Sequence, residues 1–181
     1  AREVGRPGAR GRQRKGGPGT GARGARGTVS GDKAGEQVGS NIAEAIAKGA
    51  TVRLGGTRHA LGGRFVEPTI LTGVTPAMAV AREETFGPVA PLFRFTTDDE
   101  AVALANDTEF GLAAYFYGRD ISRVWRVAEA LEAGIVGINT GIISTEVAPF
   151  GGVKESGLGR EGSKYGIEEF VEIKYLCFGG I

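Results

Sequence analysis

Residues 83–88 have the sequence Glu-Glu-Thr-Phe-Gly-Pro, which combines two acids, an aromatic ring and a Gly-Pro bend. A bend at this point would place a carboxylate and a flat ring on one side of the chain. A carboxylate accepts two hydrogen bonds, as the two hydroxyls of a ribose require, and the ring could cover a sugar or a nicotinamide. Taken alone the motif is weak, and an acidic turn with Phe86 in the core is the simpler interpretation.

A second motif spans residues 149–161, with the sequence PFGGVKESGLGRE. Its glycines allow the backbone to fold closely and to approach a neighbour. Gly157-Leu158-Gly159 could cradle a phosphate, but a bare Gly-x-Gly without the strand before it and the fingerprint after it is weak, so we predict a structural turn. His59 has no partner ligands for a metal and is expected in an exposed loop, and no metal site is predicted.

The elements that must position these motifs alternate between helices and strands. Apolar residues at helical spacing predict helices within residues 36–49, 97–110, 120–134 and 163–170. Short apolar runs predict strands within residues 51–56, 65–74, 88–95, 111–118, 134–139 and 171–178. This order predicts an α/β fold with a largely parallel sheet.

Charge divides the chain into a tail and a body. Residues 1–28 hold eight of the 22 Lys and Arg residues and one of the 21 acids, and they offer almost nothing apolar to bury. We expect residues 1–31 to be a disordered Gly/Arg-rich tail. An Arg/Gly tail can bind nucleic acid, but no aromatic residue is interleaved for base stacking, so no nucleic-acid partner is predicted. No apolar run reaches the length of a membrane span, and a cytoplasmic protein is the expectation.

The two motifs, with strands and helices between them, resemble the aldehyde dehydrogenase superfamily over roughly residues 32–181. Residues 139–144 (NTGIIS), 162–170 (GSKYGIEEF) and 172–175 (EIKY) resemble the succinate-semialdehyde dehydrogenases within it. The resemblance implies that residues 32–170 are the C-terminal part of the catalytic domain and that residues 171–181 are a strand that joins a neighbouring subunit in a homo-oligomer.

The resemblance also implies a role for individual residues in an enzyme that oxidises succinate semialdehyde to succinate with NAD or NADP. Glu84 would bind the nicotinamide ribose, and Phe86 would pack against that end of the cofactor. Ser144 would hydrogen-bond the distal carboxylate of the small aldehyde substrate, and Phe150 would line the tunnel to the nucleophile. Glu161 would lie on a proton path. For each of these residues the alternative is structural: a solvated acid, a core ring, a turn serine or a helix-start acid.

Aldehyde oxidation in this superfamily also needs a cysteine thiolate, a glutamate general base and a dinucleotide-binding domain. The only cysteine is Cys177, far along the chain from the tunnel residue, and it is predicted to be an interface residue. We therefore expect a fragment of a larger enzyme that is inactive by itself. A non-catalytic partner that docks through its last strand, and a nucleic-acid binder that uses the Arg/Gly tail, remain as alternatives.

Overall fold

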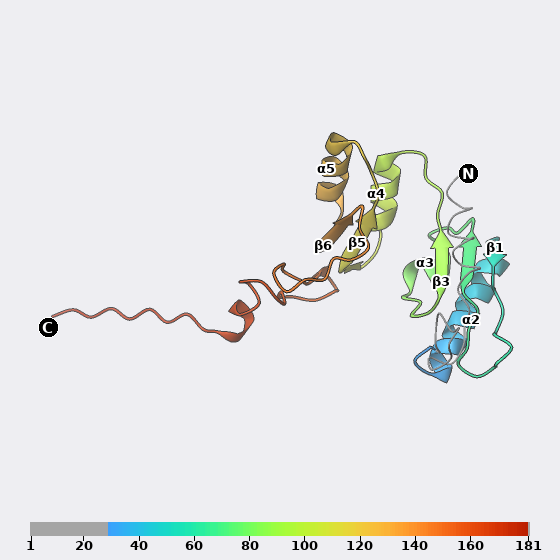
Figure 1. The fold of residues 1–181 in the computed structure, drawn as a ribbon, viewed down its shortest axis with the longest axis horizontal. Helices are drawn as coiled ribbons and strands as arrows, with labels where there is room; N and C mark the ends of the chain where they lie inside the picture. Colours follow the sequence, from blue (N-terminus) through green and yellow to red (C-terminus); the bar gives the residue numbers. More distant parts are fainter. Residues whose placement is uncertain (1–28, 181) are drawn as a thin grey trace. The chain divides into compact units, whose positions relative to one another are not determined.

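The computed structural model describes residues 29–180, which form two compact units that meet in sequence between Arg94 and Phe95 (Figure 1). The predicted tail lies outside the described residues as far as residue 28. Val29 already belongs to the first unit, because it is buried and its N–H donates to the carbonyl of Arg64 at 3.0 Å.

The first unit packs one long helix against a three-stranded sheet. The strands lie in the order β1-β2-β3, with β1 antiparallel and β3 parallel to the central β2. Its elements are α2 (Asp32–Ala47), β1 (Thr51–Leu54), β2 (Thr69–Thr72), α3 (Ala79–Arg82) and β3 (Val89–Leu92).

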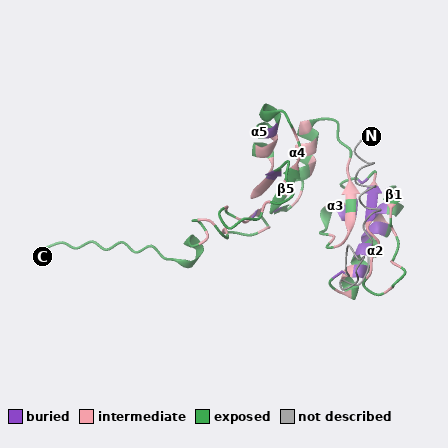
Figure 2. Cartoon of the chain, viewed as in Figure 1, coloured by how far each residue is buried: buried purple, intermediate pink, exposed green. Residues whose placement is uncertain are grey.

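Most of the buried residues belong to the first unit, as the purple segments of Figure 2 show. Val38, Ile42 and Ala45 lie on one face of α2, at the spacing that brings side chains together on a helix. They join Leu71 of β2 and Met78, which are almost completely buried. Val89, at the start of β3, and Phe93, directly after it, pack against this core.

The second unit contains two short strand pairs and two helices. β5 and β6 are parallel, and β4 and β7 form a two-residue antiparallel pair. The elements are α4 (Asp98–Asn106), β4 (Phe110–Gly111), β5 (Ala113–Phe116), α5 (Ile121–Ala130), β6 (Ile135–Ile138), β7 (Val153–Lys154) and a single 3-10 turn, η1 (Glu168–Phe170).

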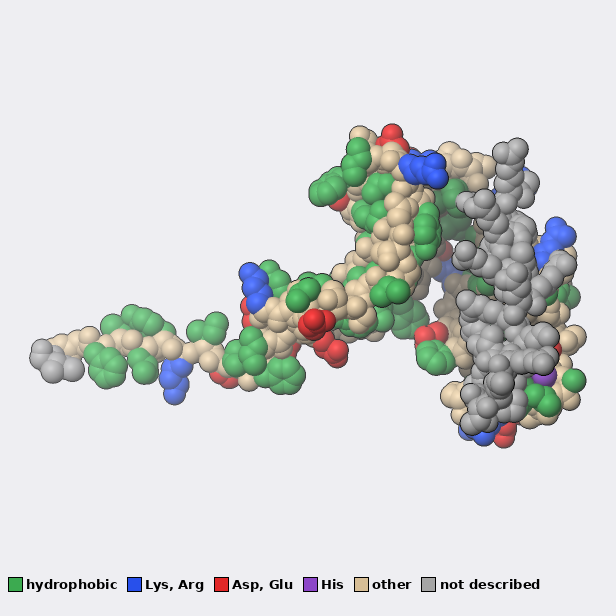
Figure 3. Space-filling view, in the orientation of Figure 1, with side chains coloured by type: hydrophobic (Ala, Val, Ile, Leu, Met, Phe, Trp, Pro, Cys, Tyr) green, Lys and Arg blue, Asp and Glu red, His purple; other side chains and the backbone are tan. Residues whose placement is uncertain are grey.

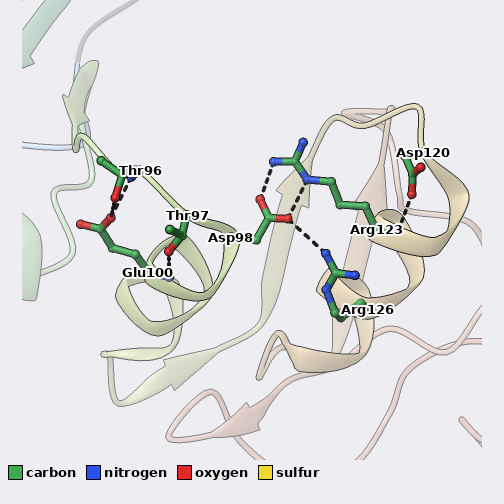
Figure 4. A network of polar contacts seen from close by, with 7 residues as sticks. All are labelled: Thr96, Thr97, Asp98, Glu100, Asp120, Arg123 and Arg126. Carbon is green, nitrogen blue, oxygen red and sulfur yellow. Dashed lines mark hydrogen bonds and ion pairs between the residues drawn. The ribbon is translucent and has the colours of Figure 1, made fainter.

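An ion-pair cluster connects α4 to α5 (Figure 4). Asp98, at the start of α4, accepts from Nε of Arg123 at 2.7 Å and also pairs with Arg126 at 3.4 Å. The Arg123 guanidinium beside Asp98 lowers the pKa of that carboxyl. Both helices begin with a side-chain cap, because Thr97 and Asp120 accept from backbone N–H groups three residues ahead. The cluster holds together the two helices of this unit.

The alternation of helices and strands is confirmed, and the two pairs β2–β3 and β5–β6 are parallel as predicted. One segment differs from the sequence prediction. Residues 163–170 form turns and the 3-10 turn η1 instead of an α-helix. Residues 171–180 are extended and pair with no strand of residues 29–180, so the strand that would join a neighbouring subunit stays a prediction. None of the helices in residues 29–180 is long and apolar enough to cross a membrane.

Candidate functional site

The acidic turn at residues 83–88 is held from behind by α2. The buried side chain of Asn41 donates from Nδ2 to the Thr85 hydroxyl at 3.1 Å. Two residues later Gly87 lies so close to Val38 that an added Cβ would come within 2.6 Å of a Val38 methyl carbon. The middle of the turn is therefore fixed on the helix by one polar and one apolar contact.

The two predicted cofactor residues flank Thr85 and point away from this anchor. Glu84 is exposed, and the ring of Phe86 is 74% exposed. Within residues 29–180, Phe86 is therefore not packed in the core. A carboxylate and a flat ring stand together on the surface of a turn whose centre is anchored.

Phe150 and Glu161 are brought together although they lie at opposite ends of the glycine-rich motif. They form an antiparallel bridge, with N–H to carbonyl distances of 2.8 and 2.7 Å in the two directions. Phe150 is half-buried and Glu161 is exposed. Arg160 closes the loop by donating from Nη1 to the carbonyls of Gly152 at 2.8 Å and Gly159 at 2.7 Å.

Glycine is required in this loop because backbone segments touch there. A Cβ on Gly134 would lie 2.0 Å from the carbonyl oxygen of Gly151, and a Cβ on Gly151 would lie 2.6 Å from that of Gly159. Gly157 and Gly159 adopt positive φ angles of 106° and 80°, which glycine reaches without strain. These contacts favour the structural turn predicted for Gly157-Leu158-Gly159.

Ser144 lies in the loop that follows β6. Its side chain is exposed, and its hydroxyl makes no hydrogen bond to any of residues 29–180. The chain then runs beside the glycine-rich motif, where the N–H of Ser163 donates to the carbonyl of Glu146 at 2.8 Å, and reaches Phe150.

Ser144, Phe150 and Glu161 thus belong to one connected part of the second unit, whereas Glu84 and Phe86 belong to the first. The residues that hold these side chains in place are not predicted from the sequence. Asn41 and Arg160 carry no reactive pattern of their own, and Gly134 reads as an ordinary turn residue. Only the spacing of Asn41 on the buried face of α2, next to Ile42, distinguishes it in the sequence.

The structure also describes the surroundings of His59 and Cys177. His59 is not simply exposed: it is half-buried, its ring lies 6.0 Å from that of Phe65, and its Nε2 is 3.6 Å from a Glu67 carboxylate oxygen. No group of three His, Cys, Asp or Glu residues within 29–180 could hold a metal ion. Cys177 is exposed, and its hydrogen bond with the Tyr175 hydroxyl raises the pKa of that tyrosine.

Comparison with known proteins places this geometry in a family. Residues 9–176 match the aldehyde dehydrogenase family. The chain is 65% identical over 149 residues to the glutarate-semialdehyde dehydrogenase of Pseudomonas aeruginosa, which is 82% of the chain and 31% of that relative. It is 66% identical over 148 residues to the NADP-dependent succinate-semialdehyde dehydrogenase GabD of Escherichia coli, again 82% of the chain and 31% of the relative.

A solved structure supports the same assignment. The succinate-semialdehyde dehydrogenase of Burkholderia pseudomallei superposes with a TM-score of 0.94 at 63% identity, covering 97% of this chain and 36% of that one. The chain therefore spans about a third of the length of these proteins. It belongs to the aldehyde dehydrogenase family.

Proposed function

We propose that this chain is the C-terminal part of an NAD(P)-dependent dehydrogenase that oxidises succinate semialdehyde to succinate. The observation that carries the proposal is the Ser144 hydroxyl, which is exposed and unbonded within residues 29–180, in the loop that follows β6. A hydroxyl in this position can donate to an anion at the far end of a substrate.

The relatives' names support this class of substrate. Succinate semialdehyde and glutarate semialdehyde each carry an aldehyde at one end and a carboxylate at the other. A hydrogen bond to a charged group contributes about 1.5–3 kcal/mol where water is excluded, so one hydroxyl can separate such substrates from uncharged aldehydes. We assign that role to Ser144.

Enzymes of the family use NAD or NADP, and the acidic turn suits the nicotinamide end of either. The Glu84 carboxylate would accept from the ribose hydroxyls, and the exposed Phe86 ring would cover the adjacent face. When bound, the nicotinamide accepts a hydride from the substrate. The anchor formed by Asn41 and Val38 would keep both side chains aimed at it.

In the second unit, Phe150 and Glu161 would work side by side. The half-buried Phe150 would form an apolar wall of the aldehyde passage and so exclude water. The exposed Glu161 carboxylate, joined to Phe150 by the backbone bridge, would receive or pass on a proton near that passage.

The reaction further requires a thiolate that attacks the carbonyl. Cys177 is the only cysteine of the chain and lies in the extended segment after Phe170, away from the Phe150–Glu161 bridge in sequence. We therefore assign the nucleophile, the general base and the dinucleotide-binding domain to residues that are not in this chain.

A chimeric enzyme tests the substrate assignment. The segment of E. coli GabD that matches this chain is replaced by the corresponding residues of the chain, which are 66% identical. Ser144→Ala in the chimera should raise KM for succinate semialdehyde about ten-fold or more, from the loss of about 1.5–3 kcal/mol. KM for butanal, which has no carboxylate, should stay unchanged.

Ser122→Ala serves as the control, because Ser122 is an exposed serine on α5. It should change neither KM. Equal losses for both substrates in Ser144→Ala, or no loss for either, would remove Ser144 from the substrate site.

The second candidate function is a non-catalytic partner that docks onto full-length subunits. One observation favours it: apolar side chains project along the unpaired segment 171–180, as the green side chains in Figure 3 show. Ile173 is 98% exposed, and Tyr175 and Phe178 are mostly exposed. Mixing the tagged chain with E. coli GabD and measuring co-purification tests it, and a variant with Ile173→Lys and Phe178→Lys should not co-purify.

A further inference from the structure

The loop that carries Ser144 begins with an unusual residue. Asn139 follows the last residue of β6 and has a positive φ of 58°, a conformation that Asn tolerates better than most residues. Its backbone N–H still continues the strand pairing by donating to the carbonyl of Phe116 at 3.0 Å. The chain therefore turns sharply at the point where the parallel pair β5–β6 ends.

The Asn139 side chain continues this ladder after its own backbone has turned away. Its Oδ1 accepts from the N–H of Gly118 at 2.9 Å, and its Nδ2 donates to the carbonyl of the same glycine at 2.7 Å. Two hydrogen bonds from one planar amide to one backbone residue fix both the position and the tilt of that amide. The start of the loop is clamped to Gly118, two residues after the end of β5.

The loop is also held just before Ser144. The Thr140 hydroxyl bonds with the backbone of Ile142, accepting from its N–H at 3.2 Å. Ile143 then lies against β6, because a Cβ added to Gly137 would come within 2.9 Å of an Ile143 methyl carbon. Ser144 follows a loop that is fixed at Asn139 and packed at Ile143, which explains how an exposed hydroxyl can keep a defined place.

We propose that Asn139 is a positioning residue for recognition of the substrate's anionic end, because its amide clamp on Gly118 sets the place of the Ser144 hydroxyl. This inference rests on the role proposed above for Ser144. Asn139 does not touch the substrate. Without the clamp the loop would sample more conformations, and the hydroxyl would meet the carboxylate in only some of them.

Loss of the Asn139 clamp would affect some aldehydes and not others. An aldehyde with a distal carboxylate would lose affinity, since ordering the loop would then oppose its binding. An uncharged aldehyde would lose nothing, because it makes no use of the hydroxyl. A general weakening of the fold, in contrast, would affect both substrates alike.

The test uses Asn139→Gly in the chimeric enzyme, since glycine can adopt the positive φ of this position without strain and has no side-chain amide. The matched control is Asn106→Gly. Asn106 also makes one donor and one acceptor bond to backbone in the second unit, donating to the carbonyl of Ala130 at 2.8 Å and accepting from the N–H of Glu132 at 2.9 Å. Both variants lose one amide and two hydrogen bonds, and only Asn139 adjoins the Ser144 loop.

Asn139→Gly should raise KM for succinate semialdehyde about 3- to 10-fold. This range corresponds to the net contribution of one hydrogen bond to binding. KM for butanal should stay within about two-fold. Asn106→Gly should lower the melting temperature but leave the ratio of the two KM values unchanged.

Two results would overturn the inference and are distinguishable. If Ser144→Ala is selective for succinate semialdehyde but Asn139→Gly gives the same KM ratio as Asn106→Gly, Asn139 is only structural and the proposed function stands. If Ser144→Ala is itself not selective, the substrate role of Ser144 and the positioning role of Asn139 both fall.

Discussion

The close contact between Gly87 and Val38 should make the packing of the acidic turn on α2 sensitive to substitution at either residue. Val38 is 1% exposed, and its nearest methyl carbon lies 2.6 Å from the place of a Cβ on Gly87. Valine rotates poorly about χ1 in a helix, so it cannot swing away cheaply. Gly87→Ala should therefore overpack the site and cost about 1–3 kcal/mol in the free energy of unfolding.

A second substitution, at Val38, measures the energy of the contact between residues 87 and 38. Val38→Ala removes the clashing methyl groups and leaves a cavity, at a cost of about 2–3 kcal/mol. In the double variant the new methyl group of residue 87 enters the space left by Val38, so the two losses should not add. We expect the double variant to lose at least 1 kcal/mol less in the free energy of unfolding than the two single losses add up to. A coupling of about this size is found between side chains in contact.

The assay is urea unfolding of the chain followed by far-UV circular dichroism, with hydrogen exchange to assign the loss to the first unit. Gly39→Ala is the control, because a Cβ on Gly39 meets nothing within 4 Å. In the middle of α2 it should stabilise by about 0.5–1 kcal/mol through helix propensity. Additive losses in the double variant, within about 0.5 kcal/mol, would show that Gly87 does not press on Val38.

Two further predictions concern charged groups. In the chimeric enzyme, Glu84→Gln should slow hydride transfer about 10- to 100-fold in single-turnover measurements, since an amide offers one acceptor and no charge; Glu83→Gln, at the end of α3, should not. Arg123 lowers the pKa of Asp98, so the stabilisation from the ionised carboxyl is present above the unfolded pKa of about 3.9 and is lost as pH falls through the lower folded value. The difference in stability between the wild-type chain and Asp98→Asn should therefore shrink on acidification, and a constant difference would contradict the pairing with Arg123.

Much of the fold was predictable because local patterns decide it. The apolar spacing of Val38, Ile42 and Ala45 specified α2, and Thr97 followed by three acids specified the start of α4. The C-terminal part was less predictable. Residues 163–170 have helical composition, but Gly166 N–H bonds back to Gly162 and the chain continues as a 3-10 turn. Glycines at 162 and 166 weaken any helix there.

The division into two units could not be predicted, because it depends on which strands pair. The parallel pairs β2–β3 and β5–β6 form separate sheets, while β1 and the two-residue strands add antiparallel pairs. The pairing of β4 with β7 joins residues more than forty positions apart in sequence. Such pairing leaves no local signal in either two-residue strand.

The candidate site shows why sequence reasoning found one kind of residue and missed another. Glu84, Phe86 and Ser144 have chemistry that a motif search recognises, and all three are exposed. Their positions depend on neighbours whose contribution is geometric: a buried amide at Asn41, a missing Cβ at Gly137 and an amide clamp at Asn139. An amide or a glycine carries no chemical signature, because its effect lies in what it touches. In this chain the residues that set the site's geometry can therefore be identified only from their contacts in the folded structure.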